Sequence, residues 1–248
     1  MKVFFIIWAC FSLLVALSPV SAQEIYGKPE APLVAEVLDT KIHTGDPEEM
    51  KYVILGKLLD QYAQDHDIEV KQAEIDTYVE SLHRVAERDR KRHEERRQEL
   101  ARKLRSTSLT DPERKSLSSE LDTVNEFLND IGEMTKNTEM NSDELRQARE
   151  QVAAAFIRQW KINRSLYKQY GGRIIFQQGG PEPLDAYRLF LQEQEKKGAF
   201  TIVDKAFEEK FWEYYLTDAK HSFYPAGSRE EEQAFETPWW LTEPREEQ

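Results

Sequence analysis

The chain has a single cysteine, Cys10, in 248 residues, and this residue lies in a short apolar segment near the start. A chain whose remaining residues carry no thiol cannot form a disulfide, bind a metal through thiolates or use a cysteine nucleophile. We therefore expect packing alone to hold the fold together, and we exclude these three kinds of chemistry.

The chain also lacks an apolar run long enough to cross a membrane. The opening stretch "MKVFFIIWACFSLLVALSPVSAQ" has a cation at Lys2, then ~15 mostly apolar residues, and the small residues Ser21 and Ala22. A spanning helix needs about 20 apolar residues, so residues 1–22 resemble a signal peptide cleaved after Ala22, with a retained anchor as the alternative. Cleavage removes Lys2 and Cys10. An exported chain without cysteine suits the periplasm of a Gram-negative bacterium.

No catalytic or cofactor-binding motif is recognisable. The histidines form no H-E-x-x-H pattern, and the chain has neither a G-x-S-x-G elbow nor a phosphate-binding loop. Carboxylates are abundant, but their order selects no catalytic pair. We expect no catalytic residues, no cofactor and no metal site, and the alternative is an enzyme with an unrecognised pair of carboxylates. The net charge of −12 argues against nucleic-acid binding.

The spacing of apolar residues predicts a mainly α fold with a few short strands. Leu33, Ala35 and Val37 alternate with more polar residues, which indicates a strand followed by a turn. Asp46 as N-cap and Pro47 at the first helical position begin a helix with a wide apolar face. A polar joint at residues 64–70 ends this helix, and the next apolar stripe begins at Ile75, Tyr78, Val79 and Leu82.

The middle of the chain predicts a charged, protruding hairpin of two antiparallel helices. Residues 87–105 hold nine Lys/Arg and five Asp/Glu, with no apolar side chain before Leu100. Residues 111–133 carry a narrow seam that suits packing against one partner helix. The members of this seam recur at spacings of four and three: Leu117, Leu121, Val124, Leu128 and Ile131.

The last third predicts a long apolar helix from residue 141 that stops at Gly171-Gly172, followed by short strands at "RIIFQQ" and "AFTIVD". We expect "GGPEP" to form a turn, and two further helices, one starting at Leu184 and one capped by Asp204. The predicted organisation is therefore a signal peptide (1–22), the start of the core (23–86), a hairpin insertion (87–140), the rest of the core (141–224) and an acidic flexible tail (225–248).

Aromatic side chains are concentrated in the second half of the chain. They either fill the core or line an open apolar groove, where broad flat side chains give contact area without demanding one sequence. For the groove, we predict five client-binding residues: Trp160, Phe176, Phe211, Trp212 and Tyr215.

The stretch "ILGKLLDQYAQDHDIEVKQAEIDTYVESL" resembles the N-terminal region of SurA-type periplasmic chaperones. The resemblance rests on a helix ending in Leu-Leu-Asp, a polar knee and a following Glu-x-Asp helix, here at Leu58, Leu59, Asp60, Ile68, Val70, Glu74, Ile75 and Asp76. Residues 145–215 resemble the rest of the family's core more loosely. Two features depart from the family: Leu38-Asp39 stands where an Asn-Gly turn is usual, and the charged hairpin is an insertion. No motif of a parvulin-type isomerase is recognisable, so the resemblance implies the chaperone core without the isomerase.

The resemblance implies an ATP-independent chaperone that holds unfolded or outer-membrane client proteins. The alternative from a different class is an assembly or scaffold subunit that docks a fixed partner through residues 87–134 or 237–241. The basic run at 87–105 also suits contact with a membrane surface, although a charged helix kept soluble by mixed signs is the simpler interpretation.

Overall fold

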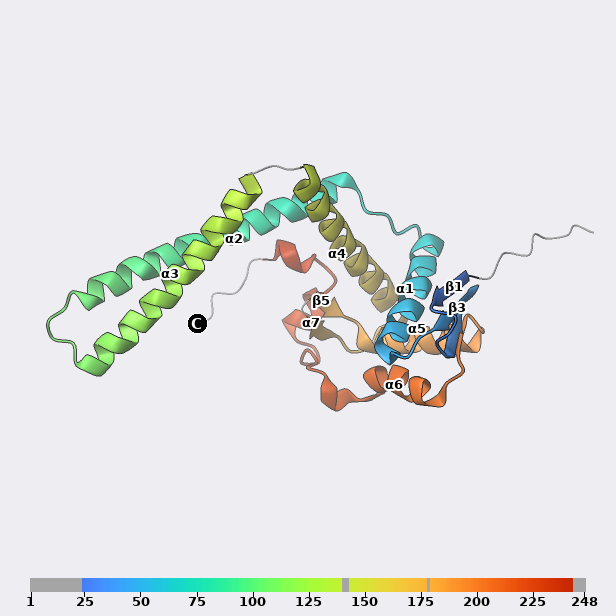
Figure 1. Ribbon diagram of the computed structural model, residues 1–248. Helices are drawn as coiled ribbons and strands as arrows, with labels where there is room; N and C mark the ends of the chain where they lie inside the picture. Colours follow the sequence, from blue (N-terminus) through green and yellow to red (C-terminus); the bar gives the residue numbers. More distant parts are fainter. Residues whose placement is uncertain (1–23, 140–142, 178, 243–248) are drawn as a thin grey trace, which may run out of the picture.

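The computed structural model describes residues 24–139, 143–177 and 179–242. The protein is mainly α, as predicted, and a long pair of helices extends from a rounded core (Figure 1). Every helix and strand of the described chain lies between Glu24 and Leu241. The predicted signal peptide lies outside the described residues.

A small sheet closes one end of the core. Its strand order is β1-β3-β2-β6, formed by β1 (Glu24–Gly27), β2 (Leu33–Val37), β3 (Thr40–His43) and β6 (Phe200–Ile202). The turn between β2 and β3 places Leu38 at φ +49°, a conformation that non-glycine residues adopt only at a cost. The amide of Leu38 donates to the carbonyl of Ala199 over 2.7 Å, which holds the turn against the segment before β6.

Helix α1 (Pro47–Asp65) begins where the sequence predicts it. The side chain of Asp46 accepts a hydrogen bond from the amide of Glu48 over 2.9 Å, and Pro47 occupies the first helical position. The buried face of α1 packs against the sheet and against helices α5 (Leu184–Lys196) and α6 (Lys205–Leu216). These elements together form the first hydrophobic core.

The polar joint after α1 redirects the chain. Asp67 adopts φ +51°, the amide of Ile68 donates to the carbonyl of Ala63, and the ring of His66 stacks on Tyr62 with centroids 4.0 Å apart. The amine of Lys161, in α4 (Asp143–Tyr170), donates to the carbonyl of Glu69 and to the carboxylate of Glu74. The joint is thus fastened to α4, and α2 (Gln72–Leu104) starts from a defined position.

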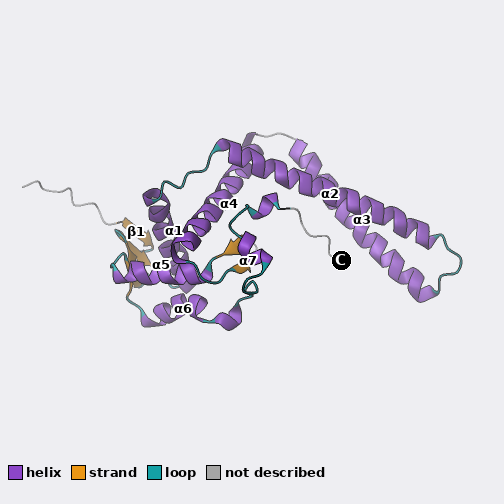
Figure 2. Ribbon diagram, turned by 180° about the vertical axis from the view of Figure 1, so that it is seen from behind, coloured by secondary structure: helices purple, strands orange, loops and turns teal. Residues whose placement is uncertain are grey.

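The predicted hairpin is formed by α2 and α3 (Asp111–Glu139), which pack against each other and protrude from the core (Figures 1 and 2). The ring of His93 stacks on Phe127 at 3.9 Å, Arg96 pairs with Glu120 at 2.6 Å, and Leu100 is fully buried between the helices. At the tip, the guanidinium of Arg114 donates to the carbonyls of Leu104 and Ser106.

The long helix α4 ends at the predicted glycine pair, where Gly171 and Gly172 have φ of +64° and +93°. Beyond it, β4 (Ile175–Gln177) pairs with β5 (Gly180–Glu182). The sequence predicts only a turn at "GGPEP", so this second strand is a difference. The strand forms because β4 supplies its hydrogen-bonding partner across a tight reversal.

The segment predicted as a flexible tail is folded over most of its length. Residues 225–242, which we call the C-terminal segment, contain the short helix α7 (Arg229–Gln233) and the 3-10 turn η2 (Trp239–Leu241). Phe235 and Trp240 are only 5% and 8% exposed. Acidic composition predicts flexibility, but these aromatic side chains find an apolar surface on α2 and α4, and burying them offsets the entropy of ordering the segment.

Candidate binding groove

An apolar groove opens where the hairpin joins the core. It has a volume of about 440 Å³ and lies between α2, α3 and α4. Six apolar side chains provide most of its wall: Val79, Leu82, Ala86, Ile131, Leu145 and Val152. Leu82, Leu145 and Val152 are 45%, 45% and 54% exposed, respectively. The groove therefore presents a group of large apolar side chains to solvent rather than single scattered ones.

Local sequence explains why this surface is apolar. On α2, Tyr78, Val79 and Leu82 lie on one helical face because residues three and four apart share a face. On α4, Leu145, Ala148 and Val152 follow the same rule. The two stripes face each other across the groove, while α2 continues beyond it into the charged hairpin. His83, Glu87 and Arg149 give the groove a polar rim.

A covered aromatic surface continues from the groove along the same two helices. A second hydrophobic core contains Tyr78 of α2 together with Phe156, Trp160 and Tyr167 of α4. Tyr78 connects this core to the groove, because it lines the groove and is only 4% exposed. The C-terminal segment lies over this surface. Trp240 contacts Tyr78 at 5.1 Å and Trp160 at 5.8 Å between ring centroids, and Phe235 contacts Tyr167 at 5.1 Å.

Aromatic packing, rather than hydrogen bonding, holds the C-terminal segment in place. Glu230 aside, the hydrogen bonds described for residues 225–242 join groups within the segment, as in the bond from the amide of Glu231 to the hydroxyl of Ser228. The indole Nε1 atoms of Trp160 and Trp239 are buried without a hydrogen-bond partner among the described residues. Each such atom costs about 1–3 kcal/mol. The contact is therefore apolar, and it leaves these two buried N–H groups without a hydrogen bond.

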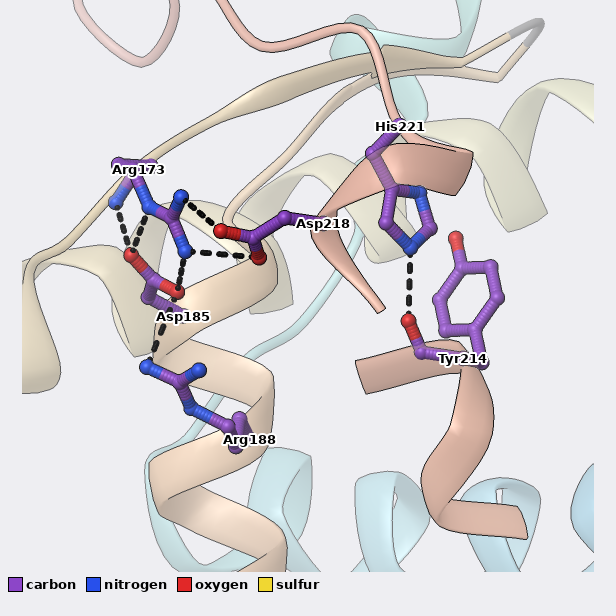
Figure 3. Close-up of polar contacts among 6 residues, drawn as sticks. All are labelled: Arg173, Asp185, Arg188, Tyr214, Asp218 and His221. Atoms are coloured by element: carbon purple, nitrogen blue, oxygen red, sulfur yellow. Dashed lines mark hydrogen bonds and ion pairs between the residues drawn. The ribbon is translucent and has the colours of Figure 1, made fainter. Parts of the chain in front are cut away.

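The chain leading into the C-terminal segment is clamped to the core (Figure 3). Arg173 donates to Asp185 from its backbone amide at 2.9 Å and from Nε at 2.8 Å, and its guanidinium also donates to Asp218 at 2.6 Å. Its positive charge and these hydrogen bonds lower the pKa of both carboxyls. Nearby, Nε2 of His221 donates to the carbonyl of Tyr214, and the guanidinium of Arg173 lies 4.2 Å from the ring centre of Phe223.

The structure does not gather the five predicted client-binding residues into one groove. Phe211 and Tyr215 are 1% and 3% exposed in the first core, where α6 packs against α5 and the sheet. Trp160 is 7% exposed beneath Trp240, and Trp212 is partly buried. Phe176, on β4, is 57% exposed. The open groove instead uses aliphatic residues, and the stripes at 75–82 and 145–152 were the sequence signal for it.

A second cleft, of about 740 Å³, is lined by α1, α4, β5 and α6. At its base the hydroxyl of Tyr214 donates to Glu182 over 3.2 Å. Burial raises the pKa of the Glu182 carboxyl, and the bond from Tyr214 together with the charges of His221 and Lys51 opposes this rise. Burial also raises the pKa of Tyr214. Asp60, also in the cleft, pairs with Arg158 at 2.7 Å.

Comparison with known proteins finds no matching family model, curated protein or solved structure. The likeness to SurA-type chaperones therefore rests on the sequence pattern alone. Across the described ranges, no group of three or more His, Cys, Asp or Glu is arranged to hold a metal ion. Within the same ranges, none of the helices is both long and apolar enough to span a bilayer.

Proposed function

We propose that this protein is an ATP-independent periplasmic chaperone that holds unfolded client chains, such as outer-membrane proteins, in the groove between α2, α3 and α4. The observation that carries the proposal is that the open groove continues an aromatic surface already occupied by an aromatic-rich segment of the same chain, made of turns and short helices. The C-terminal segment supports the proposal, because it occupies this surface with large apolar side chains and short helical turns.

Shallow apolar contact suits holding better than catalysis. The groove walls are mostly aliphatic. The free energy of contact with such side chains depends on the apolar area that is buried and does not select one client sequence. The acidic net charge of the chain keeps a protein that carries an unfolded client in solution. Release then needs no nucleotide, because folding of the client buries the same apolar groups that the groove contacts.

Aggregation suppression tests the proposal. Residues 23–248, which contain every described helix and strand, are mixed with a urea-unfolded outer-membrane barrel protein, and light scattering is followed after dilution. The groove variant L82Q/V152Q is compared with the control L189Q/L216Q, whose two leucines are 42% and 56% exposed on α5 and α6. Both variants replace two exposed apolar helix residues by glutamine, which is a good helix former.

We expect the wild type and the control to suppress scattering near equal molar ratio, and the groove variant to lose most of this activity. No suppression by the wild type would rule out general holding. Equal suppression by the two folded variants would place the client elsewhere on the molecule.

A scaffold subunit that docks a fixed partner is a second candidate, favoured by the protruding hairpin (Figure 2). Its proposed second contact, residues 237–241, faces the protein's own core, because Trp240 is buried against Tyr78 and Trp160. Deletion of the hairpin tip separates the candidates: a chaperone keeps part of its holding activity, whereas a scaffold loses its partner.

A further inference from the structure

One face of α2 carries a row of cations on the side opposite α3. His93, Arg96 and Leu100 mark the side that contacts α3. Because successive residues are about 100° apart around a helix, the opposite side is formed by residues that alternate at spacings of four and three. We name these seven exposed residues the basic stripe: Arg84, Arg88, Lys91, Glu95, Gln98, Arg102 and Arg105.

The cations of the basic stripe are largely left without internal partners. Arg84 pairs with Glu80 at 2.9 Å, but the described residues supply no ion pair to Arg88, Lys91, Arg102 or Arg105. On the flanks of the same helix the pattern is reversed, since Arg90 and Lys103 pair with neighbouring glutamates. Beside the stripe, Arg92 and Arg96 are also paired and Arg97 is not. Among the described residues, α2 thus pairs most of its other cations and leaves four of the five stripe cations without an ion pair.

The two helices of the hairpin differ in charge. Residues 111–139 of α3 hold eight Asp/Glu and three Lys/Arg, so the hairpin is basic along one side and acidic along the other. The stripe extends over roughly 31 Å at 1.5 Å per residue. The hairpin projects from the acidic core (Figure 1), and charges farther away than the Debye length of about 8 Å are largely screened at physiological ionic strength.

We infer that the basic stripe binds the anionic lipid headgroups of a membrane surface, with α2 lying along the membrane and α3 facing away. A straight row of four or more cations on a helix suits a flat anionic surface. The stripe contains no apolar or aromatic residue. A protein partner would use such residues as anchors, and single-stranded nucleic acid would stack its bases on them. Without them the contact is electrostatic and stays at the headgroup level.

Vesicle co-sedimentation tests the inference. Residues 23–248 are mixed with phosphatidylcholine vesicles, with or without phosphatidylglycerol, at low and high salt. The stripe variant R88Q/K91Q/R102Q/R105Q is compared with the control K28Q/K168Q/K196Q/K205Q, which removes four exposed cations elsewhere in the chain. A third variant, R88K/R102K/R105K, keeps the charge of the stripe. Circular dichroism verifies that each variant retains its helices.

We expect salt-sensitive binding of the wild type, the control and the lysine variant to anionic vesicles only, and an affinity about 1000-fold lower at low salt for the stripe variant, which lacks four cations. The inference is overturned if the wild type ignores anionic vesicles at low salt, or if the stripe variant binds as well as the control. Stripe-dependent binding to polyglutamate or duplex DNA that exceeds binding to anionic vesicles also overturns it, and assigns the stripe to an acidic protein or a nucleic acid. None of these outcomes depends on the groove.

Discussion

The ring of Trp240 meets that of Trp160 edge-on, with 5.8 Å between the centroids and 75° between the planes. The contact joins the end of the chain to the middle of α4 and leaves Trp160 only 7% exposed. A side chain suited to binding an apolar chain is therefore covered by the protein itself. The C-terminal segment lies over the aromatic surface that contains Trp160. The apolar groove beside it is open.

Trp240→Ala tests whether the C-terminal segment is a removable cover. Loss of a buried aromatic side chain costs about 3–5 kcal/mol. Phe235 and Trp239 also pack on α4, so we expect the end of the segment around Trp240 to detach. Tyr78 and Trp160 then become exposed, which should raise binding of a hydrophobic dye and strengthen client holding. Leu241→Ala, at a position 40% exposed, is the control. Unchanged dye binding in a folded W240A variant would show that the segment stays in place.

Phe211→Ala tests whether a predicted client-binding residue belongs to the hydrophobic core instead. Phe211 packs against Phe200 at 5.5 Å and is 1% exposed, so we expect a loss of about 3–5 kcal/mol in the free energy of unfolding. The melting temperature should fall by roughly 10 °C. Phe176→Ala, at an exposed position, should change stability by about 0.5 kcal/mol or less. Similar melting temperatures for the two variants would contradict the burial of α6.

Much of the helical framework could be predicted from the sequence because its signals are local. Asp46 with Pro47 begins α1, Asp204 caps α6, and the pair Gly171-Gly172 ends α4. Each involves residues within one turn of the helix end. The seam of α3 likewise predicted the hairpin, because its repeat at spacings of four and three requires a single partner helix.

The packing of the C-terminal segment and the location of the site were not predictable in this way. The segment's acidic composition indicates flexibility, and only the aromatic surface of α2 and α4, more than sixty residues away in sequence, explains why Trp240 is buried. The aromatic residues of α6 were ambiguous because they surround the helix. Phe211 and Tyr215 face the core, while Tyr214 reaches Glu182, and the sequence does not say which face meets α5.

Gly172→Ala tests the clamp at the root of the C-terminal segment. Gly172 has φ +93°, and an added Cβ would lie 2.4 Å from the Cβ of Asp185. The substitution should push Asp185 away from Arg173 and cost more than about 2 kcal/mol, measured by urea unfolding. Gly171→Ala is the matched control. Its φ is +64° with no neighbouring atom within 4 Å, so only the backbone cost of about 1 kcal/mol applies. Equal costs would mean that the clamp tolerates the shift.

Glu182→Gln tests the buried carboxyl of the second cleft through the pH dependence of stability. Burial raises the pKa of Glu182 in the folded protein. The folded state therefore binds a proton more readily than the unfolded state, whose glutamate pKa is about 4.3. This contribution to stability is fully present below the unfolded pKa and is lost as the pH rises through the folded pKa.

Glutamine removes this loss and can still accept the hydrogen bond from the hydroxyl of Tyr214. We therefore expect the E182Q variant to be more stable than the wild type at neutral pH, with the advantage shrinking as the pH falls toward about 4. Glu36→Gln, a substitution on β2 whose carboxyl has only a long contact of 3.9 Å to Lys41, serves as the control. Urea denaturation at a series of pH values measures both variants. An E182Q advantage that stays constant with pH would indicate a packing effect, and a loss of stability at neutral pH would mean that the charged carboxylate is needed by Lys51 or His221.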